Sequence, residues 1–239
     1  MKSEISKILI IPNYENIQIN IENKFKEILN NFNGLIFFSW EQFYSNNEIT
    51  FKQYYNSIED FLKKNSDEST IIIAESLSAA IVNSIDCKFF KKILISPIFS
   101  KSFVNPYTTN IPSYKPTKKD FILKMQKEYF LEPINHQNWD KKKLNDYNFY
   151  ILHYNLFDSI IAQFSIYENL KKIHKLETKN LKNTYILHGI YDKQSIFKKI
   201  WKYSNKYNIE LFPFELSSQH LIDEEYKKFK TIINQIIIN

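Results

Sequence analysis

Cysteine, glycine and long apolar runs are scarce in this chain. The 239 residues include one cysteine, Cys87, and two glycines. A single thiol cannot form an intrachain disulfide, and Cys87 belongs to no Cys/His cluster, so we expect a cytoplasmic protein. No apolar run approaches the roughly 20 residues that span a bilayer, and the short amino-terminal run predicts a strand, not a signal peptide.

Sequence motifs for cofactors and nucleic acids are also missing. We find no metal-ligand cluster, phosphate-binding loop or dinucleotide fingerprint, so we expect no cofactor. The net charge is +6 with a pI near 9.0. Because the lysines are scattered and form no basic block, we expect no nucleic-acid partner. A mildly positive field would still favour acidic partners or anionic substrates.

The hydrophobic pattern alternates between short apolar runs and segments with helical spacing. Apolar runs of strand length predict buried strands, and their alternation with helices predicts a mostly parallel sheet covered on both faces. A chain of this length can form one large α/β domain with a sizeable core. The expected strands are 7–11, 35–38, 70–74, 93–96, 184–187 and 210–214, and the expected helices are 17–32, 51–62, 77–85, 195–207 and 223–238.

A long segment without a convincing strand interrupts this pattern. It opens with proline-rich loop sequence and continues with helical patterns at 120–130 and 146–175, rich in aromatic residues. We therefore predict an α/β core formed by 1–100 and 182–239. Residues 101–181 would form a helical cap, inserted before the last two strands.

Three polar residues lie shortly beyond the carboxyl ends of predicted strands: Ser76, Asp192 and His220. In open α/β sheets, ligands and catalytic groups collect at the carboxyl ends of the strands. A serine hydroxyl needs a neighbouring base, which His220 could provide while Asp192 orients its ring. The bland alternatives are a serine that caps a helix and a Gly-x-x-Asp turn.

These residues carry a resemblance to a known family. The segment Ala74-Glu75-Ser76-Leu77-Ser78 resembles the Gly-x-Ser-x-Gly nucleophile elbow of α/β-hydrolases, with alanine and serine in place of the glycines. His188-Gly189-x-x-Asp192 and Ser218-Gln219-His220 resemble the family's acid and histidine segments, in the same order along the chain. The resemblance implies a serine hydrolase with Ser76 as nucleophile, His220 as base and Asp192 as orienter.

Other residues compete for these roles, and we consider each of them less suitable. Asp158 is the alternative acid, but it lies inside a helical pattern of the insertion. The remaining histidines are expected at the surface, in the cap or in a structural role, and Cys87 as a buried thiol. These histidines are His136, His153, His174 and His188.

A hydrolase of this kind also needs donors for the oxyanion. Leu77 follows the predicted nucleophile at the positive end of a helix, so its backbone N–H is one expected donor. The family usually supplies the second from the loop after an early strand, here Pro12-Asn13-Tyr14. Because proline has no N–H, Asn13 or Tyr14 is the expected second donor.

The sequence favours an esterase or thioesterase with an apolar acyl pocket beneath the cap. The substrate would be a small-molecule or acyl-carrier-linked ester, such as a pimeloyl-type methyl ester, and the enzyme a monomer or homodimer. Two alternatives stay open. One is a hydrolase-fold binding module that has lost catalysis, and the other is an unrelated Rossmann-like binding protein in which the three residues never meet.

Overall fold

The computed structural model describes residues 5–13, 18–39, 51–99, 178–192, 195–218 and 220–238. The predicted cap, 101–181, lies outside these residues except for its last four positions. The division into core and cap therefore stays a prediction. Within the described ranges, no helix is both long and apolar enough to cross a membrane.

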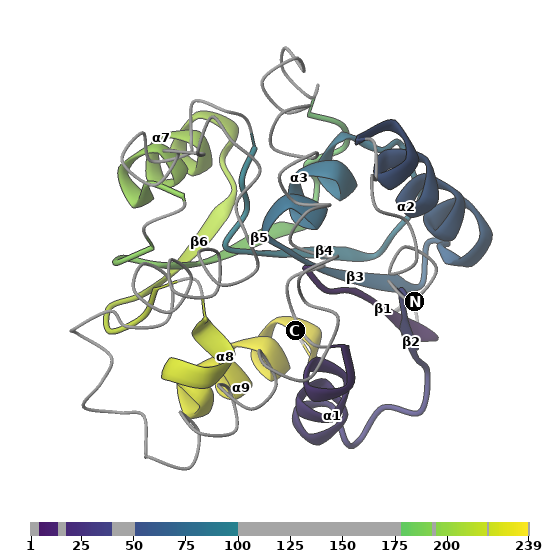
Figure 1. Cartoon of the computed structure of the whole chain (residues 1–239), viewed down its shortest axis with the longest axis horizontal. Helices are drawn as coiled ribbons and strands as arrows, with labels where there is room; N and C mark the ends of the chain where they lie inside the picture. Colours follow the sequence, from purple (N-terminus) through teal and green to yellow (C-terminus); the bar gives the residue numbers. More distant parts are fainter. Residues whose placement is uncertain are drawn as a thin grey trace, which may run out of the picture.

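The described strands form one sheet of six parallel strands in the order β2-β1-β3-β4-β5-β6 (Figure 1). The parallel α/β class predicted from the alternating pattern is confirmed. All six predicted strands are present, with small shifts at their ends. Their bounds are β1 Lys7–Ile11, β2 Leu35–Phe37, β3 Thr70–Glu75, β4 Lys91–Ile95, β5 Thr184–Gly189 and β6 Glu210–Phe214.

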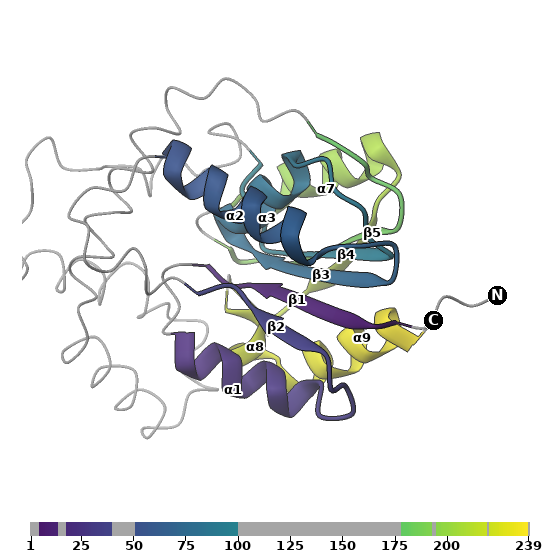
Figure 2. The same ribbon diagram turned by 90° about the vertical axis from the view of Figure 1, so that its right-hand side faces the viewer.

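Helices cover both faces of the sheet, as the continuously apolar strands require. One layer holds α2, α3 and α7, and the opposite layer holds α1, α8 and α9 (Figure 2). The helices with described bounds are α1 Gln18–Ile28, α2 Phe51–Asn65, α3 Ser76–Ser84, α7 Phe197–Tyr207, α8 Leu221–Glu224 and α9 Tyr226–Ile238. The predicted helix 223–238 is thus two helices, separated at Glu225.

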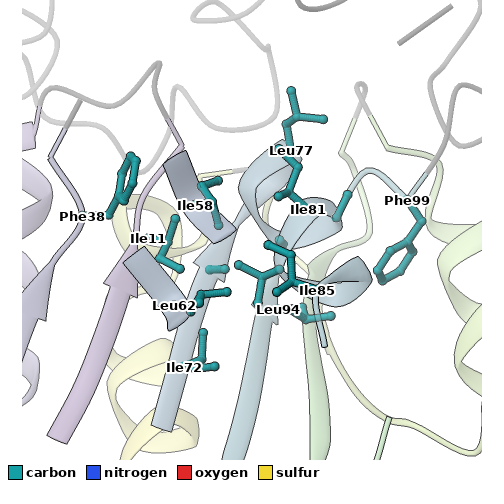
Figure 3. Close-up of a cluster of buried hydrophobic side chains, with 14 of the residues drawn as sticks. Ile11, Phe38, Ile58, Leu62, Ile72, Leu77, Ile81, Ile85, Leu94 and Phe99 are labelled. Atoms are coloured by element: carbon teal, nitrogen blue, oxygen red, sulfur yellow. The ribbon is translucent and has the colours of Figure 1, made fainter. Parts of the chain in front are cut away.

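Each face of the sheet supports its own hydrophobic cluster. Along β3, Ile71 and Ile73 pack on the side of α1 and α9, while Ile72 and Ala74 pack on the side of α2 and α3. This alternation follows from the two-residue period of a strand. Figure 3 shows the cluster on the α2 and α3 side, where side chains from these two helices meet those of the central strands.

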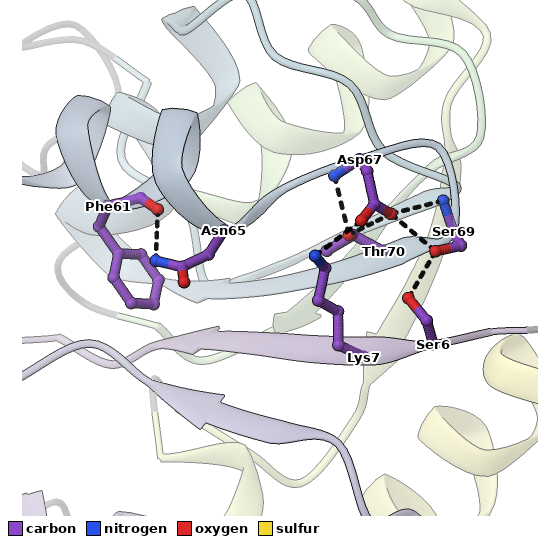
Figure 4. A network of polar contacts seen from close by, with 7 residues as sticks. All are labelled: Ser6, Lys7, Phe61, Asn65, Asp67, Ser69 and Thr70. Carbon is purple, nitrogen blue, oxygen red and sulfur yellow. Dashed lines mark hydrogen bonds and ion pairs between the residues drawn. The ribbon is translucent and has the colours of Figure 1, made fainter.

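The turn that leads into β3 is held by one carboxylate (Figure 4). Asp67 Oδ1 accepts hydrogen bonds from the Ser69 backbone N–H and the Thr70 hydroxyl, both at 2.9 Å. Its Oδ2 lies 2.6 Å from Lys7 Nζ on β1. These partners hold the pKa of Asp67 well below its ordinary value, with the Lys7 bond as the largest cause. The network fixes the start of β3 beside β1.

Candidate active site

The strand order places a crevice at the carboxyl ends of β1 and β3. The chain leaves β1 toward β2 on one side and returns to β3 on the other, so the crossovers diverge between these strands. Ligands of open α/β sheets bind at such a switch point. Asn13 follows β1 there, and Ser76 follows β3.

Ser76 stands at a sharp turn from strand to helix. Its φ is 49°, in the left-handed region that residues other than glycine rarely adopt. The N-cap position of α3 is Glu75, and Ser76 is already the first helical residue. Ser76 is therefore not the residue that caps α3. It is half-buried, has a strained backbone and lines the cavity in the crevice.

The small residues beside Ser76 allow this turn. Ala74 is fully buried and pairs with Ile11 on β1 and Leu94 on β4. Ser78 is also fully buried, and its Oγ donates to the Pro12 carbonyl at 3.0 Å. That donation uses the only hydroxyl proton of Ser78, so the Tyr54 hydroxyl donates to Ser78 Oγ at 2.8 Å. The hydroxyl of the fully buried Ser78 is thus satisfied by two hydrogen bonds.

A cavity of about 40 Å³ opens at the end of β3. Ser76 and His220 both line it, and Asn13 lies on the same wall. One part of the wall is apolar, and the remainder carries two acidic side chains and a second serine. The other described lining residues are Ile21, Glu75, Ile95, Ser96, Leu221, Ile222 and Asp223. The structure therefore brings the predicted nucleophile and base to one cavity.

Asp192 is buried beyond the end of β5, and it is not among the described residues that line this cavity. Its Oδ1 accepts a hydrogen bond from the Ser195 backbone N–H at 3.0 Å. Its Oδ2 lies 3.8 Å from Nε2 of His188. Burial lowers the pKa of His188 to about 4, so this histidine is neutral at pH 7 and forms no ion pair with Asp192.

The loops that carry Asp192 and His220 are joined to each other. The Tyr191 N–H donates to the Ser217 carbonyl at 3.1 Å, next to Gly189 at the end of β5. Two carboxylates beyond His220 hold the same loop. Glu225 Oε2 accepts from the Ser217 hydroxyl at 2.8 Å, and Glu224 accepts from both the N–H and the hydroxyl of Ser218. His220 then stands at the N-cap position of α8.

Desolvation by the surrounding protein lowers the pKa of the His220 imidazole below its ordinary value. Asp223, on α8, opposes this shift, and Lys24, on α1, adds to it. Lys24 and Asp223 also form an ion pair with each other. A lowered pKa favours the neutral imidazole of His220, which is the form that can accept a proton.

The predicted oxyanion donors have different surroundings. Leu77 is buried in the first turn of α3, where helix N–H groups lack intrahelical partners. The Asn13 N–H donates to Glu75 Oε2 at 3.1 Å. Tyr14 lies outside the described residues. Of the two proposed second donors, Asn13 is thus engaged by the residue that precedes Ser76.

Several predicted alternatives fall outside the described part of the chain, namely Asp158, His136, His153 and His174. Cys87 is partly buried, and burial raises the pKa of its thiol. Sequence reasoning missed Glu75 and Ser96 as cavity residues. The rule that identified Ser76 did not find Ser96, because the predicted strand 93–96 included this residue, whereas β4 ends at Ile95.

Among the residues described, no group of three or more His, Cys, Asp or Glu side chains is placed to hold a metal ion. Comparison with protein-family models gives no match, and comparison with curated protein sequences gives none either.

The chain has the α/β-hydrolase fold, as comparison with solved structures shows. It is similar to the esterase EaEST from Exiguobacterium antarcticum, with a TM-score of 0.61, 15% identity, and 96% of this chain and 91% of that chain covered. It is also similar to MenH from S. aureus, with a TM-score of 0.63 and 12% identity, and the match covers 99% of this chain and 95% of that chain. A third similar structure is a carboxylesterase of the thaumarchaeon Nitrososphaera gargenis. Its TM-score is 0.63 at 12% identity, and the match covers 98% of this chain and 90% of that chain.

Proposed function

We propose that this chain is a serine hydrolase that cleaves a carboxylic ester or thioester through an acyl-enzyme. Ser76 Oγ attacks the carbonyl carbon, and His220 takes the hydroxyl proton. The tetrahedral intermediate then collapses, the C–O or C–S bond breaks, and His220 returns the proton to the leaving group. Water, activated by the same histidine, hydrolyses the acyl-enzyme and restores Ser76.

The observation that carries this proposal is the backbone of Ser76. A φ of 49° is unfavourable for serine, and it occurs at the switch point of the sheet, in a cavity that also includes His220. Strain of this kind clusters at functional sites because surrounding structure must maintain it. A serine needed only for packing could have a relaxed backbone.

The remaining roles follow from position. Asp192 would orient the ring of His220, supported by the bond between the Asp192 loop and the Ser217 carbonyl. The Leu77 N–H would stabilise the oxyanion, and Asn13 or Tyr14 would supply the second donor. Asn13 could do so only after its N–H leaves Glu75.

The apolar part of the cavity wall supports an apolar acyl group in the substrate. It consists of Ile21, Ile95, Leu221 and Ile222. We extend the proposal to a cap over this wall, formed by 101–181, and to acyl groups carried on an acidic carrier, which a net charge of +6 would attract. The esterases among the solved structures are compatible with acyl chemistry on this fold.

A fluorophosphonate probe tests the acyl-enzyme mechanism directly. We expect labelling of the wild type, none of Ser76→Ala, and a large loss of ester hydrolysis in that variant. Ser84→Ala is the matched control, because Ser84 lies on the same helix and bonds only the Ile81 carbonyl at 2.7 Å among described contacts. Labelling that persists in Ser76→Ala would contradict the proposal. Absence of labelling in the wild type would favour the catalytically inactive binding module.

The acyl pocket is tested by phenyl esters of increasing acyl length. We expect kcat/KM to rise with acyl length and then fall, since an apolar wall of limited size gains contact area until it is filled. Equal kcat/KM values for all chain lengths would contradict the apolar pocket and leave the acyl-enzyme mechanism intact.

A further inference from the structure

One peptide group beside the cavity is held at both ends by residues that flank Ser76. The group joins Pro12 to Asn13, directly after β1. Its carbonyl, on Pro12, accepts a hydrogen bond from Ser78 Oγ at 3.0 Å. Its N–H, on Asn13, donates to Glu75 Oε2 at 3.1 Å. These two bonds form a peptide clamp, and because a peptide group is planar, they fix the orientation of the whole plane.

The peptide clamp extends the connection between β1 and β3 beyond their paired residues. The last register pair of the two strands is Ile11 with Ala74. The clamped peptide begins at the residue after Ile11, and Glu75 follows Ala74. Side chains thus continue the link toward the cavity, which Asn13 and Glu75 both line. The loop after β1 is therefore tied to the turn that carries the predicted nucleophile.

Glu75 serves this clamp instead of the helix that it precedes. It is the N-cap residue of α3, yet its side chain makes no capping hydrogen bond. Serine, threonine, aspartate and asparagine are the side chains that cap helices well. Glu75 is also 6% exposed, and burial of a carboxylate is unfavourable unless it accepts hydrogen bonds. Its described hydrogen bond crosses to the loop after β1, so the position of this side chain points to a role in holding that loop.

We infer that Glu75 and Ser78 are positioning residues that hold the loop after β1 in a fixed place relative to Ser76, where it presents the second oxyanion donor. This inference rests on the proposed function and gives a role to two residues that take no part in its chemical steps. An oxyanion donor acts at about 2.7–3.1 Å from the developing charge, so a displaced loop weakens binding of the transition state more than binding of the substrate. Because the clamp uses the Asn13 N–H, the second donor is the other proposed candidate, the Tyr14 N–H.

Steady-state kinetics with phenyl butyrate test the role of Glu75. We expect Glu75→Ala to lower kcat about tenfold to hundredfold, the effect of a misplaced group in an active site, and to leave KM nearly unchanged. Glu75→Gln should recover most of the lost kcat, because an amide oxygen accepts a hydrogen bond from the same N–H. An unchanged kcat in Glu75→Ala, or equal losses in both variants, would overturn the inference.

Phenylboronic acid gives a readout that does not depend on turnover. The Ser76 Oγ adds to boron, the hydroxyl proton passes to His220, and the tetrahedral boronate places an oxygen where the oxyanion would form. We expect the Ki of this transition-state analogue to rise in Glu75→Ala by about the same factor as kcat falls. A Ki that stays at the wild-type value would contradict a role in oxyanion binding and overturn the inference.

Tyr54→Phe is the matched control for packing. It removes the buried hydrogen bond from Tyr54 to Ser78 and leaves the bond from Ser78 to Pro12 in place. We expect this variant to lose stability and to keep kcat near the wild-type value. A kcat loss equal to that of Glu75→Ala would show that any damage near the turn slows hydrolysis, and would overturn the inference.

Ser78→Ala breaks the other end of the peptide clamp, so it should also lower kcat. Since both side chains hold one peptide, the double variant of Glu75→Ala with Ser78→Ala should lose less than the product of the two single effects. Strictly multiplicative losses would show that the two residues act separately, which the inference does not allow.

Two further measurements complete the design. If Glu75→Ala does not fold, Glu75→Asp replaces it, because the shorter side chain keeps the charge and withdraws the carboxylate from the Asn13 N–H. Fluorophosphonate labelling of the wild type separates this inference from the proposed function. Labelling of the wild type with an unchanged kcat in Glu75→Ala refutes only the positioning role, while absence of both labelling and hydrolysis refutes the proposed function and this inference together.

Discussion

The carbonyl oxygen of Ser218 occupies the space where a side chain on Gly189 would begin. A Cβ on Gly189 would lie 1.8 Å from that oxygen and 2.4 Å from the Ser217 carbonyl oxygen. The end of β5 can therefore approach the loop before His220 only without a side chain. One of the two glycines of the chain is thus placed where the Asp192 and His220 segments meet.

We predict that Gly189→Ala moves the loop that carries His220. The new methyl group would overlap two backbone oxygens, which cannot rotate away as a flexible side chain could. The expected result is a loss of about 1–3 kcal/mol in the free energy of unfolding, typical of overpacking. Ester hydrolysis per folded molecule should fall at least tenfold, as measured by urea titration and initial rates.

The other glycine supplies the control for this variant. A Cβ on Gly34 would lie 2.5 Å from the Ser6 carbonyl oxygen, at the opposite ends of the strands. Gly34→Ala should therefore lose stability with little change in hydrolysis per folded molecule. Equal losses of activity in both variants would mean that Gly189 has no special relation to the site.

Ser78 and Tyr54 should be energetically coupled next to the turn at Ser76. Either Ser78→Ala or Tyr54→Phe removes the 2.8 Å bond between them, and Ser78→Ala also leaves the Pro12 carbonyl without this donor. We expect each change to cost about 1–2 kcal/mol in the free energy of unfolding. The double variant should cost less than the sum by about 0.5–1.5 kcal/mol. Urea denaturation of the four proteins measures the difference, and strict additivity would exclude the coupling.

Lys24 and Asp223 should move the pH profile of hydrolysis in opposite directions. His220 accepts a proton only when it is neutral, so kcat/KM falls as pH drops through its pKa. Lys24 lowers that pKa and Asp223 raises it. Lys24→Met should shift the acid limb to higher pH, and Asp223→Asn to lower pH. Each shift should be roughly 0.2–0.7 pH units, the size of a partly exposed charge interaction.

A pH–rate series from pH 4 to 8 on wild type and both variants tests this pair. Shifts of the same sign would show that the variants act through structure and not through the charge near His220. An acid limb that neither variant moves would assign it to another group.

Much of this fold could be predicted because its signals are local. The β3 strand is apolar throughout, and a serine followed by small residues comes directly after it. Position relative to the strand, and not the missing glycines, predicted the turn at Ser76. Asp192 and His220 were likewise predicted as site residues from their positions after later strands. Parallel strands place all their carboxyl ends at one edge of the sheet, so this prediction needs only the strand ends.

The start of β4 could not be predicted, because two lysines conceal it. The strand begins at Lys91, whereas the apolar run begins at Ile93. Lys91 Nζ donates to the Ile236 carbonyl at the end of α9 at 2.6 Å, and Lys92 Nζ donates to the Asn180 carbonyl at 3.0 Å. These acceptors lie 145 and 88 residues further along the chain. Burial of a lysine therefore depends on carbonyl groups that local sequence does not reveal.

The left-handed backbone of Ser96 was also beyond local sequence. Its turn is fixed by bonds to other strands, including the Ser96 N–H to the Leu187 carbonyl at 2.8 Å. Likewise the break between α8 and α9 at Glu225 accompanies the bond of its side chain to Ser217. Both features come from tertiary contacts, which override the helical or turn preference of a segment.

Acidification should destabilise the fold through His188. Its Nε2 lies 3.0 Å from the Ser195 carbonyl, and since a carbonyl only accepts, Nε2 carries the proton of the neutral ring. Burial lowers the pKa of His188 from 6.5 to about 4. Between these values the unfolded chain binds a proton that the folded chain does not. Stability from this group is therefore complete above pH 6.5 and falls as pH drops toward 4, by up to about 3 kcal/mol.

His188→Gln isolates this effect, because glutamine can still donate to the Ser195 carbonyl but does not titrate. Urea denaturation at half-unit steps from pH 4 to 7.5 gives the free energy of unfolding of both proteins. The wild type should lose more stability than His188→Gln across the window from 6.5 to 4, while the groups common to both, including His220, cancel in the comparison. Parallel curves would show that His188 accepts a proton in the folded protein as readily as in the unfolded chain.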